Sequence, residues 1–290
     1  MADSSSILDK IIERQHLAED ASFNPSEIIG NLLKGLSTKE REIISRRFGL
    51  DGTAPKTLEE IGKSHQITRE RIRQIQVAAI KKVKALEESR AALRAVEHTV
   101  TRVLEQAGGI MAEVALLDHL LAYAEKNEQN RAALLFIISQ LLDEKVDSVK
   151  PSAQVHPGWK LKVVSLDFVH QVLQALHGIV HRHGALQPTD HLMRRFKEDP
   201  FFAEHRERLL PAGATLGSAS EADLDRVILS YLTVSAAVEQ NILGEWGLTH
   251  WTTVIPRRMG DKIYLILRQV GKPLHFTEIA DAINTAKFDH

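Results

Sequence analysis

Residues Thr57 to Leu86 read TLEEIGKSHQITRERIRQIQVAAIKKVKAL, and this segment gives the clearest structural signal in the chain. It predicts two helices joined by a tight turn. Thr57 and Glu60 have the spacing of a capping box at the start of the first helix. Thr68 is placed to cap the second helix, which continues to about Leu86. Gly62 removes a side chain where the second helix must pass close to the first.

The second helix of this stretch is predicted to be amphipathic. At about 100° per residue, its apolar side chains fall on one narrow stripe, which contains Ile72, Ile75, Ala79, Val83 and Leu86. The opposite face is mainly polar and basic, with Glu70, Arg73, Gln74, Val77, Lys81 and Lys84, and with Arg69 at its edge. We therefore expect Ile72 and Ile75 to pack against Leu58, Ile61 and Ile67, and the basic face to stay free.

This layout is typical of a helix-turn-helix that reads DNA. In that motif the first helix braces the second, and the second helix enters the major groove. Arginine can donate to O6 and N7 of guanine, glutamine pairs with adenine, and glutamate accepts from N4 of cytosine. The alternative is an ordinary charged, solvated helix face, which would require the turn, both caps and the apolar spacing to coincide by accident.

The same residues carry a family resemblance. LSTKEREIISRRFGL followed by the stretch above resembles region 4 of the primary-type bacterial sigma factors, over residues 37–86. In that family the module binds the minus-35 promoter element and the flap of the RNA polymerase β subunit. By position, the resemblance implies base or phosphate contacts from Arg69, Glu70, Arg73 and Gln74. The chain departs from the family at Ala78, where lysine is frequent, and at Gln76, where glutamate is common.

The pattern and the resemblance together give a set of candidate DNA-binding residues. We expect Arg73 and Gln74 to contact bases, and Lys81 and Lys84 to contact phosphate or polymerase. The full set is Thr57, Thr68, Arg69, Glu70, Arg71, Arg73, Gln74, Val77, Lys81 and Lys84.

Composition and charge limit the classes of protein to which this chain can belong. The 290 residues contain 43% apolar and 26% charged residues, which are ordinary values for a globular protein. Residues 37–90 hold 13 Lys and Arg against 8 Asp and Glu, so this part is basic while the remainder is acidic. The basic part is suited to contact with phosphates, whereas the acidic remainder is better suited to protein contact or to solubility.

The rest of the chain is predicted to be mainly helical. We expect a flexible tail at 1–23, in which Ile7, Leu8, Ile11 and Ile12 have the spacing of a short amphipathic helix. The helix-turn-helix domain is expected at 24–92, and two winged-helix-like domains at 93–165 and 166–255. The first of these ends in two short strands between residues 144 and 165. A skeleton of helix, glycine, extended residues and helix recurs near Gly109, Gly184 and Gly271.

The C-terminal stretch carries a second resemblance. WGLTHWTTVIPRRMGDKIYLILRQVGKPLHFTEIADAIN resembles the entry into a HARE-HTH domain, a winged-helix module. The matching residues run from Gly271 to Phe276 and include Ile279. We expect residues 256–290 to be a partial, truncated domain of this kind.

Catalytic, metal and membrane functions are not expected. The chain has no cysteine, no HExxH, no P-loop and no GxSxG motif, so we expect no enzyme, no metal site and no cofactor. Its fourteen histidines, with His177, His181 and His183 close together, are interpreted as surface residues. The chain shows neither an apolar run of membrane length nor a secretory signal, so a cytoplasmic location is expected.

The favoured function is that of a sigma-like or sigma-derived transcription factor that recognises a minus-35-type promoter element in double-stranded DNA together with RNA polymerase core. The alternative is a stand-alone DNA-binding regulator that does not bind polymerase, and a nuclease-associated enzyme is a more distant one. No membrane or small-molecule partner is expected. Because the residues before position 37 contain a single aromatic residue, Phe23, we expect the protein not to melt a promoter without another factor.

Overall fold

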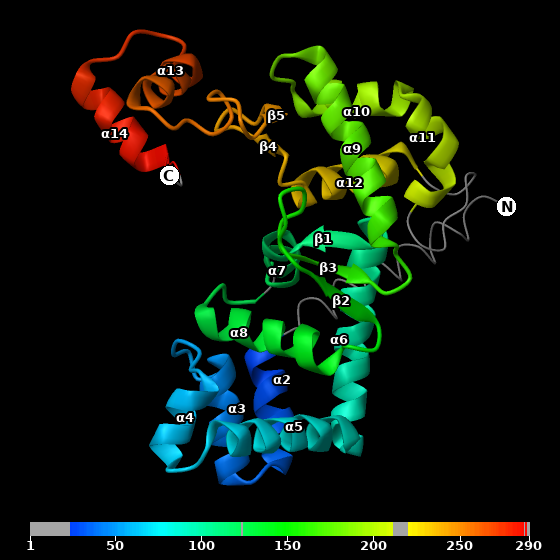
Figure 1. Ribbon diagram of the computed structural model, residues 1–290, viewed down its shortest axis with the longest axis vertical. Helices are drawn as coiled ribbons and strands as arrows, with labels where there is room; N and C mark the ends of the chain where they lie inside the picture. The colour runs from blue at the N-terminus through cyan, green and yellow to red at the C-terminus, as the bar shows by residue number, and fades with distance from the viewer. Residues whose placement is uncertain (1–23, 123, 211–219, 287, 289–290) are drawn as a thin grey trace, which may run out of the picture. The chain divides into compact units, whose positions relative to one another are not determined.

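The computed structural model describes residues 24–122, 124–210, 220–286 and 288 (Figure 1). Over these residues the fold is mainly helical, as predicted. The chain divides into two compact units: Met1–Val103 with Val114–Asp147, and Leu104–Glu113 with Ser148–His290. The finer division into a tail and four domains stays a prediction. The amphipathic segment expected at residues 7–12 lies outside the described residues.

The first unit is built from helices. They are α2 (Pro25–Leu32), the 3-10 turn η1 (Leu33–Gly35), α3 (Thr38–Phe48), α4 (Leu58–His65), α5 (Arg69–Ala85), most of α6 (Glu87–Gln106), α7 (Glu113–Leu120), α8 (Glu128–Phe136) and the π-helical turn η2 (Ile137–Leu141).

The first two α-helices of this unit begin and end at residues suited to those positions. Asn24 caps α2, because its side chain accepts from the backbone N–H of Glu27 at 3.4 Å. Ser37 and Glu40 form a capping box at the start of α3. Gly49 ends α3 with a φ of 69°, a left-handed conformation that favours glycine.

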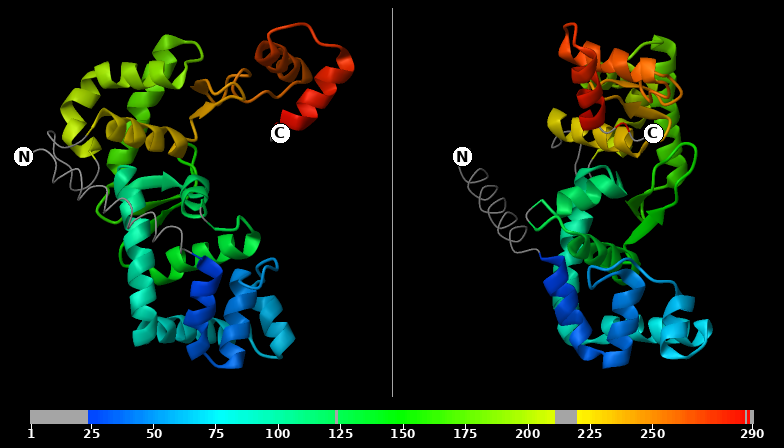
Figure 2. Two further views of the ribbon diagram at one scale, coloured as in Figure 1. Left: turned by 180° about the vertical axis from the view of Figure 1, so that it is seen from behind. Right: turned by 90° about the vertical axis from the view of Figure 1, so that its left-hand side faces the viewer.

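The α8 helix packs against α2 and α3, a contact that the sequence did not predict (Figures 1 and 2). The backbone N–H of Ser26 donates to the side-chain oxygen of Asn130 at 3.2 Å, and the Asn130 side chain is buried. Phe48 and Phe136 meet edge to face with their ring centroids 4.7 Å apart, a favoured aromatic geometry. The helix-turn-helix therefore belongs to a larger helical unit.

The second unit combines helices with short strands. Its elements are β1 (Ile110–Ala112), β3 (Gly158–Leu161), α9 (Leu166–His183), α10 (Thr189–Glu198), α11 (Pro200–His205), η3 (Arg206–Leu209), α12 (Glu221–Val234), β4 (Val238–Gln240), β5 (Trp246–Leu248), α13 (Met259–Val270) and α14 (Phe276–Ala286). The strand β2 (Val146–Val149) spans the boundary between the units, and its sheet has the order β1-β3-β2.

Antiparallel pairing and buried tryptophans organise the second unit. β1 pairs with β3 so that Ile110 lies opposite Lys160, and the hydroxyl of Ser230 on α12 donates to the Ile110 carbonyl at 2.5 Å. β4 pairs with β5. Trp159 and Trp246 are both buried in these sheets, so they are core residues.

The three glycines that mark the recurring skeleton all have left-handed backbones. Gly109 has a φ of 82°, and Gly184 and Gly271, which end α9 and α13, each have a φ of 71°. The two strands expected between residues 144 and 165 are β2 and β3. The arrangement as tandem winged-helix-like domains, with a truncated third, stays a prediction. Within the described residues, no helix is both long enough and apolar enough to cross a membrane.

Candidate DNA-binding surface

The helix α4 begins at a reciprocal cap that holds both partners in place. The Thr57 hydroxyl accepts from the backbone N–H of Glu60 at 3.3 Å, and the Glu60 carboxylate accepts from the backbone N–H of Thr57 at 2.7 Å. These two bonds form the capping box that the sequence predicted. The bond from the Thr57 backbone N–H, followed by the one from its hydroxyl, lowers the pKa of Glu60.

The turn between α4 and α5 depends on two unusual backbone positions. Gln66 ends α4 with a φ of 56° and is the only described residue other than glycine with a positive φ. The backbone N–H of Ile67 then donates to the Gly62 carbonyl at 3.0 Å. A Cβ atom at Gly62 would lie 2.8 Å from the carbonyl oxygen of Ile67, so only glycine fits without a shift of the backbone. The close approach predicted at Gly62 is therefore present.

One face of α5 is anchored in a small apolar core. Thr68 caps the helix by accepting from the backbone N–H of Arg71 at 3.2 Å. Ile72 is fully buried and forms a cluster with Ile61 and with Ile43 of α3. Three partly buried side chains pack against this cluster, namely Leu58, Ile67 and Ile75. The predicted packing is confirmed, with Ile43 as a member that the sequence analysis did not include.

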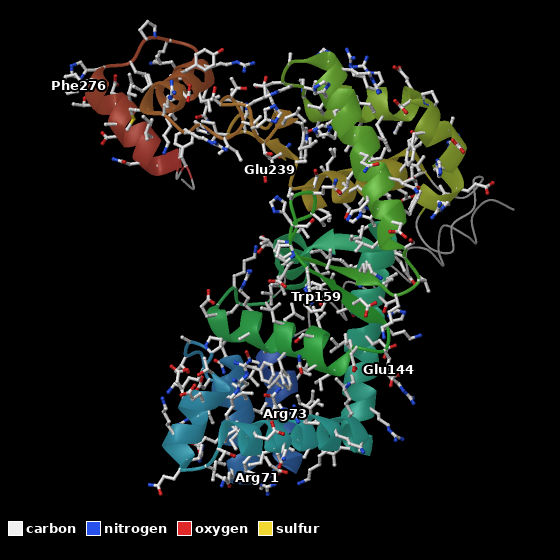
Figure 3. All side chains as sticks on the ribbon, in the orientation of Figure 1. Arg71, Arg73, Glu144, Trp159, Glu239 and Phe276 are labelled. Atoms are coloured by element: carbon white, nitrogen blue, oxygen red, sulfur yellow. The ribbon has the colours of Figure 1, made fainter. Side chains whose placement is uncertain are left out.

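The opposite face of α5 is open to solvent (Figure 3). The candidate residues are all exposed except Lys84, which is half-buried; the exposed ones are Thr57, Thr68, Arg69, Glu70, Arg71, Arg73, Gln74, Val77 and Lys81. Val77 is 52% exposed, so this face offers an apolar group beside the polar ones. Five of the polar side chains, from Arg69 to Gln74, lie within the first two turns of α5, where a groove-binding helix contacts base edges.

The polar side chains near the start of α5 form one hydrogen-bonded network. Arg73 donates through Nε and Nη2 to the two carboxylate oxygens of Glu70, at 2.9 and 2.8 Å. Arg71 donates through Nη1 to the side-chain oxygen of Gln74 at 3.2 Å. The Arg73 hydrogen bonds lower the pKa of Glu70, and Glu70 in turn raises the pKa of Arg73. Gln74 also donates through Nε2 to Glu70 at 3.5 Å, so the four side chains are linked.

The cationic side chains further along the module are not equivalent. Lys84 forms an ion pair with Asp143, just beyond η2, and Lys82 forms one with Glu40 of α3 at 3.3 Å. In the part of the chain that the structure describes, the side chain of Lys81 forms neither a hydrogen bond nor an ion pair. Lys81 is thus directly available for a phosphate, whereas a contact from Lys84 must compete with Asp143.

Sequence reasoning missed the partners that come from distant parts of the chain. Asp143 lies 59 residues from Lys84, and Asn130 lies 104 residues from Ser26. Helical periodicity within one segment holds no information about such pairs. The only signal was the strong N-cap at Asn127, which predicts where α8 begins but not what it packs against.

Two of the described histidines, His177 and His181, lie close together. The rings of His177 and His181 are 6.1 Å apart, and burial, followed by the charges of His181 and His250, lowers the pKa of His177. Among the described residues, no group of three or more His, Cys, Asp or Glu side chains is arranged to hold a metal ion.

Comparison with known proteins shows that the helix-turn-helix segment has relatives. Residues 32–85 match the family model of sigma-70, region 4. The chain is 48% identical over 58 residues to RNA polymerase sigma factor SigA of Microcystis aeruginosa, which covers 20% of this chain and 14% of that protein. It is 47% identical over 58 residues to SigA of Nostoc sp., with 20% of this chain and 15% of that protein covered.

The likeness is confined to this segment. The matched region spans about one seventh of the length of these sigma factors, and no solved structure matches the chain. Residues 32–85 run from the end of α2 to the end of α5, so the match contains the apolar cluster, the turn and the exposed face of α5. The helix-turn-helix of this chain is therefore similar to region 4 of sigma-70 factors.

Proposed function

We propose that this protein is a sigma-factor-like transcription factor whose α5 helix reads a minus-35-type promoter element in double-stranded DNA. The observation that carries the proposal is the exposed face of α5, which lies opposite the buried Ile72 cluster within a segment that matches sigma-70 region 4. A partnership with RNA polymerase core through its β-subunit flap is part of the proposal, and it rests on the same match.

The proposed roles follow from the chemistry of the exposed side chains. Arg73 and Gln74 lie one and a half turns into α5, and their donors and acceptors match the base edges of guanine and adenine. Glu70 holds the guanidinium of Arg73 with two hydrogen bonds in the unbound protein, which restricts its position before it meets a base. Arg69 and Lys81 supply positive charge for phosphates, and Thr57 and Thr68 are exposed at the starts of the two helices.

Measurements of binding to selected DNA test this assignment. Loss of a bidentate base contact in Arg73→Ala is expected to weaken the selected site by about 1–3 kcal/mol and to relax specificity at one base pair. Lys81→Ala is expected to weaken all sequences alike and to reduce the salt slope by roughly one. Lys145→Ala removes an exposed lysine from another part of the same unit and serves as the control. If Arg73→Ala binds the selected site as tightly as the wild type, the assignment is wrong.

A second function is favoured by the packing of α8. Because α8 covers part of α2 and α3, less of the surface of helices α2 to α5 is open to a partner protein than if these four helices stood without α8. A stand-alone DNA-binding regulator, which needs only the α5 face, accommodates this cover. Co-purification separates the two: a sigma-like factor retains RNA polymerase core on an affinity-tagged full chain, whereas a stand-alone regulator binds promoter DNA without retaining polymerase.

We further propose that the rest of the chain consists of winged-helix-like domains that serve protein contact. The strand order β1-β3-β2 and the bridge between Gln187 and Trp246 of β5 support a helix–strand–helices–strand–strand order in two successive segments. The first segment has α7 and α8 before its strand pair, and the second has α10, α11 and α12. The α12 helix has three acidic residues near its start, which are Glu221, Asp223 and Asp225. Such a helix is poorly suited to a phosphate backbone. α13, Gly271 and α14 then belong to a partial HARE-HTH-like domain.

A further inference from the structure

A single branched apolar side chain interrupts the polar face of α5. Val77 is 52% exposed, and at about 100° per residue it lies about 140° around the helix from the buried Ile72 and about 160° from the buried Ala79. It follows Arg73 by one turn and precedes Lys81 by one turn. Val77 is therefore directed away from the apolar core and lies near the middle of the face that we assign to DNA.

The polar side chains on either side leave an apolar gap at Val77. The Glu70 carboxylate accepts from Arg73 at 2.8 Å and from Gln74 at 3.5 Å, so these hydrogen bonds hold both side chains toward the start of the helix. On the other side, the ammonium group of Lys81 has no partner among the described residues. Val77 thus separates the hydrogen-bonded network from the cation that we assign to a phosphate.

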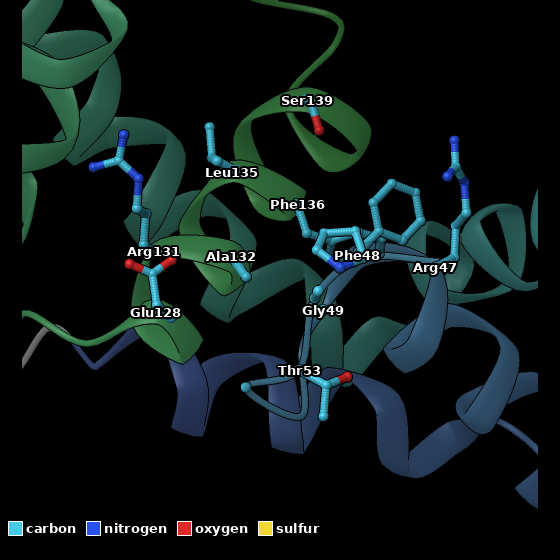
Figure 4. A pocket seen from close by; sticks show the side chains of 13 residues that line it. Arg47, Phe48, Gly49, Thr53, Glu128, Arg131, Ala132, Leu135, Phe136 and Ser139 are labelled. Carbon is cyan, nitrogen blue, oxygen red and sulfur yellow. The ribbon is translucent and has the colours of Figure 1, made fainter. Parts of the chain in front are cut away.

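The packing of α8 leaves Val77 uncovered. α8 lies against α2 and α3, and a cleft of about 620 Å³ separates it from the loop that follows α3 (Figure 4). The described residues that line this cleft include none from α5. The ion pair of Lys84 with Asp143 joins α5 to the segment after η2, about two turns beyond Val77. The face around Val77 is therefore open to a ligand from outside the unit.

The major groove of DNA offers one apolar group to such a side chain. Guanine presents acceptors there, cytosine a donor and adenine one of each, whereas thymine carries a C5 methyl group beside its O4 acceptor. A polar base edge held against Val77 would lose water without gaining a hydrogen bond, which costs free energy. The methyl group of thymine instead gains free energy when it leaves water for the methyl groups of valine. A T·A pair is thus the base pair that suits Val77.

We propose that Val77 determines sequence specificity by contacting the C5 methyl group of a thymine in the major groove. This role of Val77 rests on the proposed function, since it names one base that α5 recognises. Val77 lies about 6 Å along the helix axis from Arg73, and base pairs are about 3.4 Å apart, so the thymine lies within about two base pairs of the one that Arg73 contacts. The helix by itself does not favour valine at this exposed position, because valine is a poorer helix former than alanine.

Replacement of thymine by deoxyuridine removes only the methyl group and tests the contact directly. In the DNA selected by the wild-type full chain, each thymine is replaced singly, and the dissociation constant is measured by fluorescence anisotropy at fixed salt. At one thymine near the base pair that Arg73 contacts, uracil is expected to weaken wild-type binding about fourfold, the factor for one buried methyl group. Val77→Ala is expected to bind the thymine and the uracil DNA equally, because its shorter side chain does not reach the methyl group. Val114→Ala, which truncates an exposed valine of α7, is expected to keep the full difference.

Measuring both proteins on both DNAs separates this contact from a general effect of uracil on DNA shape, since only a loss that disappears with Val77 belongs to the contact. Thermal melts of Val77→Ala that match the wild type show that the fold is kept. If uracil weakens Val77→Ala as much as the wild type, or weakens the wild type nowhere, the role of Val77 is overturned. The proposed function still stands in that case, provided that Arg73→Ala relaxes specificity. A chain that selects no DNA sequence overturns both proposals.

Discussion

Truncating Ile72 to alanine tests the packing on which the candidate DNA-binding surface depends. Ile72 is fully buried between Ile43 and Ile61, with Leu58, Ile67 and Ile75 around them. The substitution removes three carbon atoms, and at about 0.8 kcal/mol per buried methylene the transfer contribution is roughly 2.4 kcal/mol. The cavity left behind adds to this, so a total loss of about 3–5 kcal/mol is expected. A small domain has only about 5–15 kcal/mol of stability.

Denaturant unfolding of the full chain, followed by circular dichroism, measures the loss. The matched control is Val77→Ala, which truncates an exposed branched side chain on the same helix and is expected to change stability by no more than about 0.5 kcal/mol. DNA binding by Ile72→Ala is expected to weaken through unfolding, while the fraction that stays folded keeps the wild-type sequence preference. An unfolding curve for Ile72→Ala that coincides with the wild-type curve would refute this packing.

Three further perturbations probe the same unit. Gly62→Ala places a Cβ 2.8 Å from a backbone carbonyl oxygen and is expected to lower the melting temperature. The control Gly30→Ala, on α2 with open space around it, is expected to raise the melting temperature slightly, and equal changes in melting temperature for the two variants would exclude the close approach. Asp143→Ala frees Lys84 from its ion pair and is expected to strengthen DNA binding at low salt if Lys84 reaches a phosphate, which titrations at two salt concentrations would show. The two capping boxes predict that stability depends on pH. The backbone N–H groups of Ser37 and Thr57 lower the pKa values of Glu40 and Glu60. The stability that these carboxylates contribute is therefore present at neutral pH and is lost as pH falls through their lowered pKa values. Glu60→Gln is expected to flatten that acid-side loss in thermal melts, and an unchanged acid limb would contradict it.

The helix-turn-helix could be predicted from the amino-acid sequence alone. The caps at Thr57 and Thr68, the close approach at Gly62 and the apolar stripe through Ile72 are all local, because each depends on residues within a few turns of one another. Caps and periodicity act through backbone geometry that repeats every 3.6 residues, so they can be identified without knowledge of the rest of the chain. The same reasoning identified the exposed face of α5 and the glycines of the recurring skeleton, whose left-handed backbones the structure then showed.

The contacts between segments far apart in the sequence could not be predicted in this way. The packing of α8 on α2, the cleft between α8 and the loop after α3, and the pairing of Lys84 with Asp143 join residues 59 to 104 positions apart. An apolar stripe indicates that one face of a helix is buried, but many other helices or strands could bury that face equally well. The choice among them depends on complementary side-chain shapes and on loop geometry, both of which are properties of the folded chain as a whole. For this reason the sequence predicted the α5 face, while the cleft became visible only in the folded unit.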